Sequence, residues 1–229
     1  MGGMKLFLCS AAAAAAAALL AFSAAAQPAP SMAPPSPAAR ILPVALSGPA
    51  REAAIAEANR ALNAVRLMQG RFLQISPDGS RAAGVFYLQR PGKLRFEYDP
   101  PASLLIVSDG QVVALRDRAL RTTERTPLDS TPLNLILGEQ INLTRDARIT
   151  RVERLGGSTI LITARDRSGG AEGEITLRFD GARLGSWDII DAAGGRTRIA
   201  LSGVSQPESL DRSLFRLEDM LENRPGRRG

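Results

Sequence analysis

The chain has 229 residues, of which 45% are hydrophobic and 4% aromatic, and it carries a formal net charge of +6 at pH 7. It contains no histidine and a single cysteine, Cys9. These two counts exclude serine–histidine and cysteine–histidine nucleophilic sites, histidine general bases and zinc sites built on imidazole. The composition is that of an ordinary globular chain with one domain or a small pair of domains.

Residues 1–26 have the three parts of a secretory signal peptide. Lys5 gives the positive start, residues 6–22 form an uncharged run, and small residues precede a cleavage expected after Ala26. An uncleaved N-terminal anchor is the alternative interpretation. Acylation of Cys9 is disfavoured because this residue precedes most of the apolar run and follows the bulky Leu8. We therefore expect an exported mature chain without cysteine and without disulfides.

The segment that follows the predicted signal is expected to be a linker and then a helix. Residues 27–48 are rich in proline and alanine, which predicts a disordered or polyproline-II tether. Ser47 and Pro49 are typical of a helix start. Apolar residues then recur at spacings of three and four, at Ile55, Ala58, Leu62 and Val65. This spacing predicts a helix that ends near residues 69–70.

From residue 71 onward the hydrophobic period changes to two, which indicates strands. Leu94, Phe96 and Tyr98 alternate with charged residues, and residues 174–179 repeat this pattern. Turn signals separate eleven predicted strands at 71–76, 82–89, 93–99, 103–108, 111–117, 119–124, 148–155, 158–166, 173–179, 184–191 and 195–203. One short helix is predicted over 131–137, with Thr131 as its N-cap and Gly138 as its stop. Short loops favour an antiparallel meander that must curl strongly or close.

Two of the predicted strands are apolar on both faces, at residues 104–107 and 160–162. A helix covering one face of a curled sheet, with a second apolar face left over, is the geometry of a ligand cavity. In a sandwich, both faces would simply be core. The pattern alone leaves both interpretations open.

The sequence carries no motif for nucleotide binding or for a serine nucleophile, and we expect no enzyme, cofactor or metal site. The carboxylates that could form a glycosidase pair or a calcium site are Asp109, Asp117, Asp180, Asp188 and Asp191. Most of them lie at strand ends, where aspartate is ordinary turn chemistry. Basic residues are dispersed and aromatic residues few, so nucleic acid is not an expected partner, whereas a weak attraction to anionic membrane surfaces or acidic protein patches is.

One stretch of the sequence resembles a known family. It contains Phe72-Leu-Gln74, Gly84-Val-Phe86-Tyr-Leu88, Arg90-Pro91-Gly92-Lys93-Leu94-Arg95-Phe96-Glu97-Tyr98 and Ser108-Asp109-Gly110. This stretch resembles the outer-membrane lipoprotein carrier protein family, the periplasmic chaperones of lipoproteins. Residues 128–137 and Phe215 are similar to later segments of the family, so the resemblance covers roughly residues 50–217.

The resemblance implies a mainly β (α+β) fold, an unclosed antiparallel barrel covered by a long N-terminal helix and short helices. It implies an apolar cavity for lipoprotein acyl chains, an ATP-driven inner-membrane exporter and an outer-membrane receptor as partners, and a monomer in the periplasm. Arg90 matches the family's arginine that is tied to opening, closing and cargo transfer. The expected cavity-lining side chains are Phe72, Phe86, Leu88, Leu94, Phe96, Tyr98, Leu104, Ile106 and Trp187.

These inferences divide the chain into a signal (1–26), a tether (27–48), a carrier domain (49–219) and an Arg-rich disordered tail (220–229). The alternative function is a periplasmic regulatory module of the same fold that senses lipid or lipoprotein. Such regulators usually have a second domain after the barrel. We expect none in residues 220–229, which favours the carrier.

Overall fold

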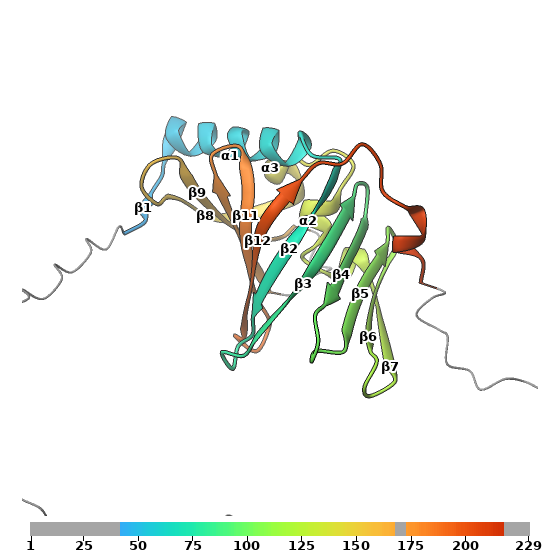
Figure 1. The fold of residues 1–229 in the computed structure, drawn as a ribbon. Coiled ribbons are helices and arrows are strands. Elements are labelled where there is room, and N and C mark those ends of the chain that lie inside the picture. Colours follow the sequence, from blue (N-terminus) through green and yellow to red (C-terminus); the bar gives the residue numbers. More distant parts are fainter. Residues whose placement is uncertain (1–41, 168–172, 218–229) are drawn as a thin grey trace, which may run out of the picture. The chain divides into compact units, whose positions relative to one another are not determined.

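The computed structural model describes residues 42–167 and 173–217, which build one twelve-stranded sheet (Figure 1). The predicted signal, residues 27–41 of the predicted tether and the predicted tail lie outside the described residues. The strands are β1 (Val44–Ala45), β2 (Leu67–Ile75), β3 (Arg81–Gln89), β4 (Lys93–Tyr98), β5 (Leu104–Asp109), β6 (Val112–Asp117), β7 (Thr122–Pro127), β8 (Ala147–Arg154), β9 (Thr159–Asp166), β10 (Glu174–Asp180), β11 (Arg183–Ile190) and β12 (Arg196–Ser205).

All neighbouring strands pair antiparallel, in the order β1-β8-β9-β10-β11-β12-β2-β3-β4-β5-β6-β7. The two ends of this order, β1 and β7, have no pairing with each other among the described residues. The prediction of an unclosed, strongly curled antiparallel sheet with few helices is therefore confirmed.

Helix α1 (Gly48–Asn63) packs on the sheet through a face of mostly small side chains. It starts at the predicted Ser47–Pro49 segment, and its buried residues are Ala54, Ile55, Ala58, Ala61 and Leu62. The prediction that the helix continues to residues 69–70 is wrong. Leu67 pairs with Gln89 and Gly70 with Phe86, so these backbone groups bond to β3 instead of to a helix.

The chain between β7 and β8 leaves one end of the sheet and returns beside the other, and it fills the interior as it passes. It contains η1 (Leu128–Ser130), α2 (Asn134–Leu137) and α3 (Leu143–Asp146). Its buried apolar residues are Leu128, Leu135, Ile136, Leu137, Ile141 and Leu143. The Asn63 amide exchanges two hydrogen bonds with the backbone of Ile141, at 2.7 and 2.9 Å, and Asn59 accepts one from the Leu143 N–H at 3.0 Å. Helix α1 thus fixes this segment in place.

The short helix predicted over residues 131–137 is divided in the structure. Only α2 is helical there, and Gly138 ends it as predicted. Thr131 does not cap it, because its hydroxyl donates backwards to the Leu128 carbonyl at 2.8 Å. The polar side chain therefore closes η1 instead of opening α2.

Two other strand boundaries differ from the predicted ones. Strand β7 begins at Thr122 and not at residue 119, because the Asp117 carboxylate accepts the N–H groups of Ala119 and Leu120 and holds them in the turn. Strand β1 lies inside the segment predicted as a tether and pairs with β8.

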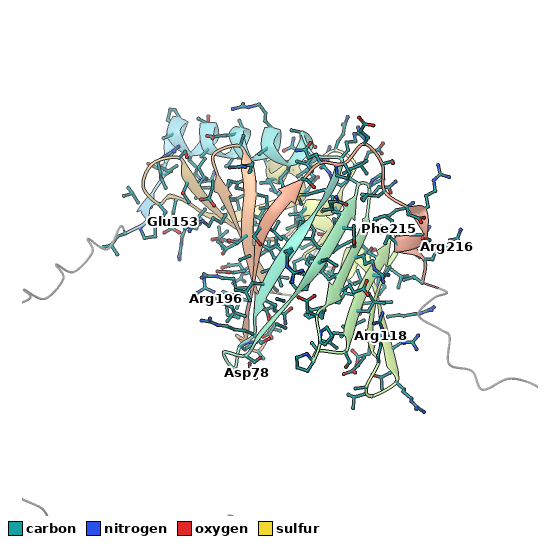
Figure 2. All side chains as sticks on the ribbon, in the orientation of Figure 1. Asp78, Arg118, Glu153, Arg196, Phe215 and Arg216 are labelled. Atoms are coloured by element: carbon teal, nitrogen blue, oxygen red, sulfur yellow. The ribbon has the colours of Figure 1, made fainter. Side chains whose placement is uncertain are left out.

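The doubly apolar strand β5 is explained by packing on both faces. Leu104 and Ile106 pack against the main core, whereas Leu105 and Val107 form a second cluster with Ala114, against which Leu217 packs. The 3-10 helix η2 (Arg212–Phe215), whose Phe215 is labelled in Figure 2, contacts β4 and β5 and brings this C-terminal segment onto the outer face. The surplus apolar face of β5 is therefore ordinary core.

Candidate functional site

The interior of the sheet contains a cluster of aromatic rings centred on Phe96 of β4. The Phe96 ring centroid lies 4.7 Å from that of Phe72, 5.9 Å from that of Phe86 and 6.1 Å from that of Trp187. Tyr98 joins the cluster at 4.9 Å from Phe72. These rings come from β2, β3, β4 and β11, so the cluster ties both halves of the sheet together.

Two glycines on neighbouring strands make room for these rings. In the register of β2 and β3, Gly70 lies opposite Phe86 and Phe72 lies opposite Gly84. A Cβ atom on Gly84 would come within 2.7 Å of the Phe72 ring and 2.1 Å of the Glu97 carbonyl oxygen. A Cβ on Gly70 would meet the Phe86 ring at 2.9 Å. Each ring therefore lies over the glycine of the adjacent strand.

The hydroxyl of Tyr98, a polar group in this cluster, has a hydrogen-bond partner. The Tyr98 hydroxyl donates to Gln74 Oε1 at 2.6 Å. Burial disfavours the phenolate and raises the pKa of Tyr98 to about 12. Tyr98 is accordingly a neutral hydrogen-bond donor at any physiological pH.

An apolar cavity of about 380 Å³ lies beside the aromatic cluster, where the end of α1 meets the sheet. Its apolar wall comes from Ala61, Leu62, Val65, Met68, Leu88, Ile136, Leu184, Leu201 and Val204. Polar groups also line it, among them Arg90, Arg183 and Asp180. A volume near 300–1,000 Å³ with mainly apolar walls and a few polar groups is typical of a small-molecule or lipid site.

Arg90 ties the sheet to the elements around this cavity. It lies at the end of β3 with only 6% of its surface exposed. Its Nε donates to the Val65 carbonyl at 2.6 Å, its NH1 to the Gly138 carbonyl at 3.5 Å, and its NH2 to the carbonyls of Leu62 and Val65. The ends of α1 and α2 are therefore held by one guanidinium.

The charge of Arg90 is stabilised by these carbonyl oxygens alone, since no carboxylate of the described residues forms an ion pair with it. Burial, and then the positive charge of Arg66, lower the pKa of Arg90 below its ordinary value. A buried cation without a counter-ion is costly, and several carbonyl oxygens must offset that cost.

The predicted site residues fall into three groups in the structure. Leu88 and Arg90 line the cavity. Phe72, Phe86, Leu94, Phe96, Tyr98 and Trp187 are buried in the main core, and the partly buried Leu104 and Ile106 pack against that core. Cavity residues such as Met68, Leu184 and Val204 were not predicted. Met68 fell in the segment wrongly predicted as helix. Leu184 on β11 and Val204 on β12 reach the cavity only through the pairing of β11 with β12 and of β12 with β2.

The aspartates considered as catalytic or metal-binding candidates have other partners. Asp109 and Asp191 accept backbone N–H groups in their own turns, as Asp117 does. Asp180 pairs with Arg178, and the buried Asp188 pairs with Arg196 and Arg198. Within the described ranges, acidic residues do not gather in groups of three that could hold a metal ion. Each of the five carboxylates thus has a local structural role.

The fold and this site define a class: an open antiparallel sheet with a helix-covered apolar interior and a small cavity. The model of the family described as "Outer membrane lipoprotein carrier protein LolA" matches residues 63–218. An outer-membrane lipoprotein carrier protein of Pseudomonas fluorescens is 30% identical over 173 residues, covering 72% of this chain and 83% of that protein. One from Azotobacter vinelandii is 30% identical over 175 residues, covering 72% and 84%. The chain belongs to the outer membrane lipoprotein carrier protein family.

Solved structures are more distant. A LolA superfamily protein from Nitrosomonas europaea is 12% identical, with a TM-score of 0.42 over 74% of this chain and 98% of that one. The family assignment therefore rests on the sequence matches. No described helix has the length and hydrophobicity to cross a bilayer.

Proposed function

We propose that this protein is a periplasmic chaperone that holds the acyl chains of lipoproteins in its apolar interior and carries them from the inner to the outer membrane. The observation that carries this proposal is the cavity lined by Leu88 and by Arg90, whose guanidinium donates hydrogen bonds to the ends of α1 and α2. The family membership supports lipoprotein as the cargo.

Arg90 is the proposed gate. The cavity is at the small end of the range for ligand sites, so loading requires the end of α1 and the segment after α2 to move away from the sheet. That movement breaks the bonds from Arg90 to the carbonyls of Val65 and Gly138. Hydrogen bonds from a charged donor contribute about 1.5–3 kcal/mol each. The free energy of the loaded state is therefore raised by the loss of these hydrogen bonds, and this favours transfer of the cargo to the next protein.

The energetics of an acyl chain require direct transfer between proteins. At about 0.8 kcal/mol per buried CH₂, one long acyl chain gains on the order of 10 kcal/mol when it leaves water. Escape through water is correspondingly slow. The chain has no P-loop motif, so loading must draw energy from a partner. We infer an ATP-driven inner-membrane exporter as donor and an outer-membrane receptor as acceptor.

The test is to purify the protein from the periplasm of its own cells and identify bound molecules by mass spectrometry. Acylated lipoproteins should co-purify, and Arg90→Leu should accumulate more of them because its closed empty state is weakened. Arg66→Leu is the matched control, since Arg66 is an exposed neighbour that lacks these bonds. An absence of lipoprotein from both wild type and Arg90→Leu would overturn the proposal. Equal amounts of bound lipoprotein in wild type, Arg90→Leu and Arg66→Leu would show that Arg90 does not control loading or release.

A further inference from the structure

The hairpin of β6 and β7 places an exposed leucine at the tip of the sheet. Leu120 is 72% exposed, more than any other large apolar side chain among the described residues. The hairpin projects from one corner of the sheet in Figure 1, and all six residues of β7 are exposed. Leu120 therefore lies outside the core, and its side chain is presented to whatever surface the tip meets.

Arginines surround this leucine. Arg118, labelled in Figure 2, and Arg121 lie in the turn, and Arg125 follows on β7. The Asp117 carboxylate is occupied within the hairpin, where it accepts the Ser103 hydroxyl at 2.7 Å and the N–H groups of Ala119 and Leu120 at 2.8 and 3.1 Å. The NH2 of Arg118 lies 3.8 Å from Oε1 of Glu97, which is a long ion pair between two exposed side chains. The tip thus presents an apolar side chain among cations.

The backbone of the turn is unusual at one of these arginines. Arg121 has a φ of 57°, and it is the only non-glycine residue with positive φ among those that the structure describes. The turns at Gly79, Gly92, Gly110, Gly181 and Gly194 use glycine for this conformation. A left-handed conformation is unfavourable for residues with a Cβ, so the chain keeps an arginine side chain where glycine would fold more easily.

We propose that this tip docks on an anionic phospholipid membrane, with Leu120 entering the interface and Arg118 and Arg121 contacting lipid phosphates. An apolar side chain flanked by basic residues is the combination that binds anionic lipid surfaces. Addition of a further strand to β7 is disfavoured, because this edge carries Glu124, Arg125 and Pro127. One leucine and a few arginines give a weak, reversible contact, which suits a protein that must leave the surface again.

The test is the partition of the purified full chain onto vesicles of phosphatidylcholine alone and of phosphatidylcholine with phosphatidylglycerol, followed by co-sedimentation. Binding should require phosphatidylglycerol and weaken as salt is raised. Leu120→Ser should lower the partition coefficient about tenfold, the effect of leaving one leucine in water. Arg121→Gly should lower it about fivefold through one lost charge while keeping or improving the turn.

The matched controls are Leu42→Ser, which removes another exposed leucine, and Arg81→Gln, which removes an exposed arginine elsewhere on the sheet. Both should bind like wild type. In Leu120→Trp, a brominated lipid should quench the new indole, whereas Trp187 is buried and should be unaffected. Absent vesicle binding, or tip variants that bind as tightly as the two controls, would overturn the proposal, including the case in which another segment or an acidic protein is the true contact.

Discussion

The guanidinium Nε of Arg90 lies 2.6 Å from the carbonyl oxygen of Val65, and this contact joins the end of β3 to the chain leaving α1. Beyond Asn63, the backbone N–H groups of Ala64 and Val65 bond only to the helix-end carbonyls of Arg60 and Leu62. Arg90 therefore adds to the anchoring that Asn63 and the buried Leu62 give to the end of α1.

Arg90→Leu should accordingly loosen the end of α1 while the sheet stays intact. The amide protons of Ala64 and Val65 should exchange at least about tenfold faster, because a local opening loses the stabilisation from charged hydrogen bonds. Arg90→Lys should show an intermediate effect, since an ammonium lacks the planar fork. Hydrogen-exchange mass spectrometry of the peptides around residue 64 measures this, with Arg66→Leu as control. Unchanged exchange in Arg90→Leu would contradict the assigned role.

A bulky side chain at the cavity wall should block acyl binding without unfolding the protein. Val204 lines the cavity and is 40% exposed, so Val204→Trp can occupy the cavity space with little packing strain. We expect the affinity for a fluorescent fatty-acid probe to fall about tenfold or more, given the apolar contact area lost. Leu42→Trp adds the same indole at an exposed position that does not line the cavity and should leave binding unchanged. Equal affinities in the two variants would place the acyl chains elsewhere.

The aromatic cluster should dominate stability. Phe96 is 4% exposed and contacts three rings, so Phe96→Ala should lower the free energy of unfolding by about 3–5 kcal/mol. Leu73→Ala, at an exposed position on β2, should cost about 1 kcal/mol or less. Urea unfolding followed by circular dichroism measures both. A small loss for Phe96→Ala would mean that the rings are loosely packed.

The stability of the protein should fall at alkaline pH through Tyr98. Its pKa is about 12 in the folded protein and about 10 in the unfolded chain. Because the folded-state value is raised, the contribution is complete below pH 10 and is lost between pH 10 and 12, at about 1.4 kcal/mol per pH unit. Urea unfolding at pH 8, 10 and 11 should show this decline, and Tyr98→Phe should reduce it. A decline of the same size in Tyr98→Phe would assign it to other groups.

The close approach at Gly84 should tolerate no side chain. Its Cβ would lie 2.1 Å from the Glu97 carbonyl oxygen, so Gly84→Ala must separate β3 from β4 or displace Phe72, at about 2 kcal/mol or more. Gly138→Ala is the control, because its Cβ would meet its neighbours at an ordinary 3.7 Å. Thermal unfolding distinguishes the two. Similar melting temperatures for both variants would show that the strands adapt easily.

The sheet was largely predictable because its inward rows alternate cleanly. Leu94, Phe96 and Tyr98 are all buried, as the period of two predicts. The end of α1 was not predictable, since Leu67 and Met68 continue an apolar pattern that a helix and a strand can share. Pairing with β3, a contact made through long-range folding, decided between the two.

The candidate site was predictable only where a local motif carried it. Arg90 was found because it stands before Pro91 in a stretch that resembles the family. The wall formed by Leu184, Leu201 and Val204 was not, because β11 and β12 come to the same cavity as Leu88 only when β12 pairs with β2. The apolar second face of β5 suggested a cavity, but the C-terminal segment covers it, and a pattern of two apolar faces cannot say which chain segment covers either.

The unpaired ends of the sheet have a consequence for capacity. A closed barrel has a circumference fixed by its strand number and shear, so its interior cannot swell without breaking hydrogen bonds between strands. Here no ladder among the described strands joins β1 to β7, and every residue of these two strands is exposed. Under the proposed function, we therefore expect the interior to widen by separation of β1 from β7 with every strand pairing kept, so that cargo of different size disrupts only side-chain contacts, which re-form when the cargo leaves.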